Sequence, residues 1–180
     1  MNQLTADFFT LFALPSAFRI SPAALEERYL ALQREAHPDR FAGADEKTRR
    51  LSVQLAARIN EGYQTLKQPL SRALYLLQHL GCDAGLTDSS ALPAEFLLEQ
   101  MECREAVARA SGNAPGLQRI LESLGRDLEN CYETLGRLLD DKQDYPAAAD
   151  LAQRLMFLEK LRHDADEAMF DLQDGNRKSD

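Results

Sequence analysis

The sequence lacks tryptophan and contains only nine glycines and three cysteines among its 180 residues. Long alternating runs of Val, Ile and Thr, which would indicate β-strands, are also missing. No apolar run approaches the ~20 residues that a membrane-spanning helix needs. Cys82, Cys103 and Cys131 are scattered and odd in number, so they predict neither a disulfide framework nor a thiolate metal site. We therefore expect a helical protein with reduced thiols, no membrane span and no metal or other cofactor.

The residues that are abundant, Leu, Ala, Glu, Gln and Arg, are good helix formers. The net charge of −8 is unevenly distributed: residues 1–80 hold 10 Lys/Arg and 8 Asp/Glu, whereas residues 81–180 hold 11 and 21. Such an acidic second half disfavours binding to nucleic acid or to anionic membranes. The N-terminus has no basic lead and does not resemble a signal peptide. These features predict a cytoplasmic protein with two parts that meet different partners.

Four helices are predicted in the first half of the chain. A short aromatic helix covers 5–13. Ser21 and Pro22 are the residue types preferred at an N-cap and a first helical position, and the helix that they start continues until Pro38 stops it. A third helix runs from about 45 to 68. The fourth follows Pro69 and ends at Gly81, a residue type common after helix ends.

Residues 81–93 are rich in Gly, Asp, Ser and Pro and are predicted to form a linker between an N-terminal domain of residues 1–80 and a C-terminal domain. Three longer helices are expected in the second domain, at 94–110, about 115–141 and about 146–173, before a frayed tail at 174–180. Short connections make neighbouring helices antiparallel, so we predict a three-helix bundle. The fold class is therefore all-α.

The tripeptide His37-Pro38-Asp39 lies between two predicted helices. Taken alone, it fits a simple helix stop made by Pro38, with Asp39 capping the following segment. An acid–base or metal pair of His37 with Asp39 is a second alternative, which would make the protein an enzyme. The other histidines, His79 and His163, fall in other predicted helices and bring no companion ligands, so nothing predicts a three-ligand zinc site.

The surroundings of the tripeptide resemble a J domain over residues 7–77. A short aromatic helix precedes it, arginines flank it, and the next helix contains the sequence INEGYQTL at 59–66. The resemblance implies a hairpin of two helices with the tripeptide exposed at its tip. It also implies that this tip stimulates the ATPase of a DnaK-like chaperone. The implied chaperone-binding residues are His37, Pro38, Asp39, Arg28, Arg34 and Arg40.

Three stretches make the whole chain resemble the HscB family of iron–sulfur co-chaperones: DFFTLF at 7–12, FLLEQME at 96–102 and FLEKLR at 157–162. The resemblance implies that the chain activates a chaperone of the HscA type and delivers to it a scaffold protein of the IscU type, without being an enzyme itself. The extra cysteine pairs of eukaryotic members are absent, which favours the bacterial type. A J-domain protein for another client, or a helical interaction module without chaperone activity, is the alternative.

The helix predicted at 94–110 has two dissimilar faces. At ~100° per residue, one side of it gathers the residues expected to face the bundle: Phe96, Gln100, Cys103, Val107 and Ala110. Leu97, Leu98 and Met101 fall well away from that side, although they are apolar. An apolar patch of this kind is typical of a protein-binding surface.

Acidic residues and part of the last helix complete the predicted surface. Glu102 and Glu105 adjoin the apolar residues, while Met156 and Phe157 lie off the apolar stripe of the last helix. Alternatively, some of these residues pack against the J domain or fill an edge of the bundle. Arg104 is either part of the surface or a solvated neighbour. The HscB resemblance implies that the scaffold protein is bound by Leu97, Leu98, Met101, Glu102, Glu105 and Phe157.

Overall fold

The computed structural model describes residues 4–41, 43–82 and 94–177, without the side chains of residues 38, 39, 94 and 175–177. Within these ranges the regular elements are all helical, which confirms the predicted all-α class. The predicted linker lies outside the described residues from position 83 on, as do the last three residues of the predicted tail. The chain divides into two compact units, Met1–Cys82 and Asp83–Asp180. No described helix combines the length and apolar character needed to cross a membrane.

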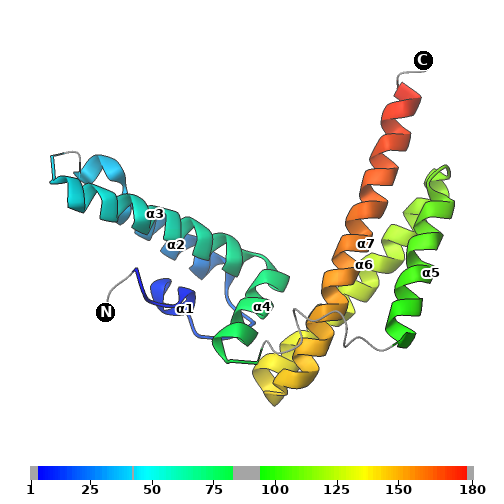
Figure 1. Cartoon of the computed structure of the whole chain (residues 1–180), viewed down its shortest axis with the longest axis horizontal. Coiled ribbons are helices and arrows are strands. Elements are labelled where there is room, and N and C mark those ends of the chain that lie inside the picture. The colour runs from blue at the N-terminus through cyan, green and yellow to red at the C-terminus, as the bar shows by residue number, and fades with distance from the viewer. Residues whose placement is uncertain (1–3, 42, 83–93, 178–180) are drawn as a thin grey trace. The chain divides into compact units, whose positions relative to one another are not determined.

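The first unit is a helical hairpin with short flanking helices, as expected. Figure 1 shows α2 and α3 side by side, with the turn η1 at one end of the pair. The elements are α1 (Phe8–Leu11), α2 (Pro22–Ala36), η1 (Pro38–Phe41), α3 (Glu46–Lys67) and α4 (Pro69–His79).

The predicted helix signals of this unit are confirmed by the bonds at its helix ends. The side chain of Ser21 accepts a hydrogen bond from the Ala24 N–H at 3.3 Å, which caps α2. At the other end of the unit, Gly81 has a φ of +70°. The N–H of Cys82 then donates to the carbonyl of Leu77 at 2.8 Å, the pattern that closes a helix through a left-handed residue.

Helix α1 is shorter than the predicted 5–13 because both of its ends are capped early. Asp7 accepts a hydrogen bond from the Thr10 N–H at 3.0 Å, and Ala13 turns into the left-handed region with a φ of 52°. The helix packs its aromatic side chains onto α3 at Gly62. A Cβ on that glycine would stand 2.8 Å from Phe8 Cδ1, so the close approach requires glycine.

The second unit is the predicted three-helix bundle, with α6 and α7 packed together and α5 against both. Its elements are α5 (Ala94–Ala110), α6 (Ala114–Gly136), the π-helical turn η3 (Arg137–Lys142) and α7 (Tyr145–Arg177). The turn η3 replaces the last residues of the helix predicted at 115–141. Helix α7 ends at Arg177, four residues beyond the predicted 173.

Leucine and alanine side chains of α6, η3 and α7 form the core of the bundle. From α6 and η3 it takes Leu117, Leu124, Leu128, Leu135 and Leu139. From α7 it takes Ala148, Ala152, Leu155, Leu158, Leu161 and Ala165. Cys103 and Cys131 are half-buried beside this core, and burial raises the pKa of both thiols. A raised pKa disfavours the reactive thiolate, consistent with a packing role.

Candidate functional site

The tip of the α2–α3 hairpin is where helix α2 stops before a proline. The backbone of His37 turns to an extended ψ of 127°, as the residue before proline favours. Its carbonyl accepts a hydrogen bond from the Arg40 N–H at 3.1 Å, which closes the turn η1, and its side chain is exposed. The side chains of Pro38 and Asp39 lie outside the described residues. The tip therefore presents an imidazole to solvent on a short, hydrogen-bonded turn.

Two of the three predicted arginines lie at this tip. The Arg40 guanidinium donates to the Arg34 carbonyl at 3.2 Å, which places positive charge at the C-terminal end of α2, where the helix dipole favours it. Arg28 lies nine residues before His37, about 13 Å along the helix. Its Nε donates to the Phe12 carbonyl at 3.2 Å and so supports the chain after α1. The structure thus gathers His37, Arg34 and Arg40 but not Arg28.

A groove of about 610 Å³ runs between α2 and α3 next to the tip. Its lining residues are Leu30, Gln33, Arg34, His37, Arg40, Ala56 and Asn60. Leu30 and Ala56 were not among the predicted site residues, although Leu30 is off the buried stripe of α2 and is 43% exposed. An exposed position for an apolar residue, off the buried stripe of its helix, is the sequence pattern that would have indicated Leu30.

Side-chain hydrogen bonds hold the two arms of the hairpin together along this groove. The Tyr29 hydroxyl donates to Asn60 Oδ1 at 3.0 Å, and Gln33 Nε2 donates to the same oxygen at 3.3 Å. The Tyr29 ring stacks on that of Tyr63 with centroids 3.9 Å apart. The Tyr63 hydroxyl in turn donates to the Glu26 carboxylate, which raises the pKa of that tyrosine. We call Tyr29, Gln33 and Asn60 the polar clamp.

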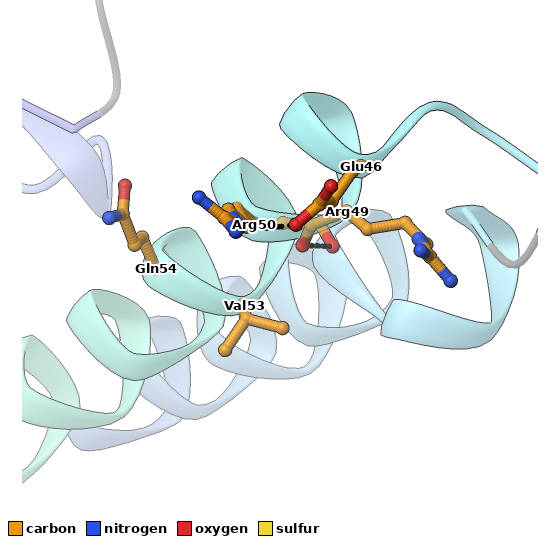
Figure 2. A pocket seen from close by; sticks show the side chains of 6 residues that line it. Glu46, Arg49, Arg50, Val53 and Gln54 are labelled. Carbon is orange, nitrogen blue, oxygen red and sulfur yellow. Dashed lines mark hydrogen bonds and ion pairs between the residues drawn. The ribbon is translucent and has the colours of Figure 1, made fainter.

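A second hollow, of about 520 Å³, lies on α3 near its start (Figure 2). Figure 2 shows Glu46 and Arg50 turned toward each other, and the two form an ion pair. The charge of Arg50 is therefore offset within the hollow, and Arg49 supplies its remaining positive charge. Nothing in this arrangement selects a ligand, so we do not include it in the candidate site.

On the second unit, α5 carries the exposed apolar side chains that the sequence predicted. The exposed fractions are 43% for Leu97, 61% for Leu98 and 60% for Met101. Glu102 and Glu105 are exposed on the same helix. We call these five residues the α5 patch. The residues predicted to face the bundle, such as Val107, are buried or half-buried instead, so the predicted division of the helix faces is confirmed.

Phe157 differs from the expectation that it lies off the packed side of its helix. It is only 8% exposed, because its ring packs edge-on against Phe96 with centroids 5.9 Å apart. The Arg104 guanidinium carbon lies 5.8 Å from the Phe157 centroid, within reach of a cation–π contact. For Phe157 the alternative of packing within the bundle is therefore correct. Met156, its neighbour, is 43% exposed as expected.

The two other histidines lie apart from each other and from the hairpin tip. His163 lies 3.4 Å from Glu167 one turn on along α7, and both are exposed. His79 packs near the ring of Tyr75 in the first unit. Across the described ranges, no three or more His, Cys, Asp or Glu side chains are placed to hold a metal ion.

Comparisons with known proteins match nearly the whole chain. A family model described as the HSCB C-terminal oligomerisation domain matches residues 92–166. The co-chaperone protein HscB homolog of Aromatoleum aromaticum is 46% identical over 169 residues, which cover 93% of this chain and 96% of that protein. The co-chaperone protein HscB homolog of an Azoarcus species is 47% identical over 169 residues, which again cover 93% of this chain and 96% of that protein.

Solved structures give the same match. Chaperone HscB from Vibrio cholerae has a TM-score of 0.81 and 34% identity, and the match covers 93% of this chain and 99% of that one. Human co-chaperone protein HscB has a TM-score of 0.82 and 28% identity, over 90% of this chain and 81% of that one.

Proposed function

Since the chain belongs to the HscB family of co-chaperones, which act in iron–sulfur cluster assembly, we propose that it couples an ATPase chaperone to its client. The J domain, residues 1–80, would stimulate ATP hydrolysis by a DnaK-like chaperone of the HscA type. The bundle, residues 94–173, would bind a scaffold protein of the IscU type and deliver it. The chain would work in the cytoplasm and contribute no catalytic residue of its own.

Support on the chaperone side comes from the hairpin tip. His37 is exposed, Arg34 and Arg40 lie beside it, and no described acidic side chain forms an ion pair with either arginine. Exposed cationic side chains steer encounter with an acidic partner. Pro38 limits the conformations of the turn and so lowers the entropy lost on docking. Asp39 would then pair with a cation of the chaperone.

Support on the client side comes from the α5 patch, and this observation carries the proposal. Leu97, Leu98 and Met101 are exposed together although the bundle has a continuous core of its own, so their apolar surface is available to a partner. Glu102 and Glu105 would add charged contacts at the rim. Phe157 would act from beneath, by supporting α5 through Phe96.

Single-turnover ATP hydrolysis by the cognate chaperone, with and without the scaffold protein, tests both halves. Wild type should accelerate hydrolysis, and the scaffold should increase that acceleration further. The triple variant His37→Ala/Pro38→Ala/Asp39→Ala should lose stimulation while still retaining the scaffold in a pull-down. Leu97→Ala/Met101→Ala should still stimulate alone but lose the added effect of the scaffold.

Phe170→Ala is the matched control for the client half, because Phe170 is 68% exposed on α7 and is not part of the α5 patch. It should bind scaffold as wild type does. An unchanged rate for the triple variant would remove the activator role. Equal scaffold retention by Leu97→Ala/Met101→Ala and wild type would remove the client surface.

A further inference from the structure

We propose that Arg154 of α7 is a positioning residue for client binding, which holds the first half of α5 through an ion pair with Glu99 and so fixes the direction in which the α5 patch faces. This inference rests on the proposed function, because it concerns the binding of the scaffold protein. It adds two residues that do not belong to the α5 patch, and it assigns neither of them a contact with the scaffold.

The two halves of α5 are held in different ways. Among the described side chains of this helix only Val107, in the second half, is buried. The second half also leads into a short turn to α6, in which the Asn113 N–H donates to the Ala110 carbonyl at 2.8 Å. The first half carries the exposed side chains of Leu97 and Met101. This half therefore depends on contacts outside the buried core for its position.

Two contacts attach the first half of α5 to α7. The Arg154 guanidinium donates to Glu99 Oε1 at 2.6 Å, a charge-assisted hydrogen bond between residues that are far apart in the sequence. The Phe96 ring packs edge-on against the ring of Phe157. Since Phe96 and Glu99 are about one helical turn apart, α5 is attached to α7 at two successive turns.

The directions of the contacts around the axis of α5 show what the ion pair contributes. At ~100° per residue, Glu99 lies ~60° to one side of Phe96, and Arg104 lies ~80° to the other side. The Arg104 guanidinium carbon is 5.8 Å from the centroid of Phe157. A single ring contact would leave α5 able to roll about its own axis, whereas contacts on both sides of it oppose rolling in either direction. Removal of Arg154 takes away one of these two contacts.

Small movements of α5 matter because the patch lies far from Val107. Leu97 is about 15 Å from Val107 along the helix, so a swing of about 10° around Val107 would shift Leu97 by about 2.6 Å. A binding surface has to be held to within ~0.5 Å of its productive geometry. Both side chains of the ion pair are nearly half-exposed, so the pair contributes little to the stability of the bundle. Loss of Arg154 should therefore change scaffold binding more than folding.

A double-mutant cycle on the full chain tests the positioning role, with calorimetry of scaffold binding as the measurement. Glu99→Gln and Arg154→Gln should each raise the Kd for the scaffold protein by about fivefold, because an α5 that is no longer held must be ordered on binding. The double variant Glu99→Gln/Arg154→Gln should bind no more weakly than either single variant, since all three lack the same contact. The reversed pair Glu99→Arg/Arg154→Glu should return to within about twofold of wild type.

Arg162→Gln is the matched control, because Arg162 is exposed on the same helix and its loss changes the charge of α7 by the same amount. It should bind the scaffold as wild type does. Weaker binding by Arg154→Gln with Glu99→Gln unchanged would assign Arg154 a direct contact with the scaffold and so overturn the positioning role. A reversed pair as weak as the single variants, or no change in any variant, overturns it as well.

Hydrogen exchange of the full chain without any partner reports on α5 itself. In Arg154→Gln the amides of residues 95–102 should exchange at least about threefold faster than in wild type, whereas those of residues 103–110 and of α6 should be unchanged. Circular dichroism and melting temperature establish that each variant is folded. Equal exchange in variant and wild type, or faster exchange throughout the bundle, overturns the inference. Absence of scaffold binding by wild type contradicts the proposed function instead, so the two failures are distinguishable.

Discussion

The two units of this chain present opposite kinds of surface to their surroundings. Beside the hairpin tip, the first unit shows arginines, amides and an imidazole, and the amides take part in hydrogen bonds between α2 and α3. On α5, the second unit shows leucine and methionine side chains flanked by glutamates, above a layer of packed aromatic rings. One chain thus offers a charged contact and an apolar contact, which respond to different conditions and can be disrupted separately.

The largest expected effect is a difference in stability between a variant of the α5 patch and a variant of the aromatic layer beneath it. Phe157→Ala should destabilise the second unit by roughly 3 to 5 kcal/mol, because it removes a buried ring and leaves a cavity against Phe96. Leu97→Ala, at an exposed position, should change stability by less than about 0.5 kcal/mol while still weakening scaffold binding. Urea unfolding of both variants measures the difference. Equal midpoints would mean that Phe157 belongs to the surface after all.

The same glycine substitution should act oppositely in the two units. Gly62→Val should destabilise the first unit by about 2 kcal/mol, because even a Cβ there would stand 2.8 Å from Phe8 Cδ1 and 2.9 Å from Phe12 Cε2. Gly125→Val on α6 should be neutral or slightly stabilising, since nothing lies within 4 Å of the place that a Cβ would take there and glycine is unfavourable within a helix. Differential scanning calorimetry of the full chain measures both. A melting temperature for Gly62→Val at or above that of wild type would contradict the packing of α1.

The smallest expected effect is a difference in salt dependence between the charged contact at the hairpin tip and the apolar contact on α5. Raising the salt concentration from about 0.05 to 0.3 M shortens the screening length. The concentration for half-maximal ATPase stimulation should therefore rise several-fold, roughly 1 kcal/mol of weaker docking, because exposed arginines drive encounter. Scaffold binding, measured by calorimetry over the same range, should change by less than about twofold, since burial of apolar surface is little screened. Equal salt dependence of both contacts would remove the contrast.

Local signals in the sequence were sufficient to predict most of the fold. Ser21 and Pro22 marked the start of α2, and Gly81 marked the end of α4, because caps depend on residues close in the chain. The single-sided pattern of α5 also predicted that Leu97 and Met101 are exposed. These features depend on residues within one helix, where the spacing along the sequence determines which face of the helix each side chain occupies.

Features that depend on two helices at once were not predictable in this way. Phe157 lies off the main apolar stripe of α7 and yet is buried, because α7 packs against both α5 and α6 and so has two buried faces. The groove likewise combines Leu30 of α2 with Ala56 of α3, and no pattern within either helix brings them together. The spacing of apolar residues did not predict the π-helical turn after Gly136 either.

The polar clamp also bears on which partner must change shape. Tyr29 and Gln33 of α2 are both tied to Asn60 of α3, which fixes the spacing of the two arms at that level. A rigid co-chaperone cannot adapt to several forms of the chaperone and instead favours whichever form already fits it. Under the proposed function, the conformational free energy of the encounter would then be borne by the ATPase, and this chain would select among the states of its partner.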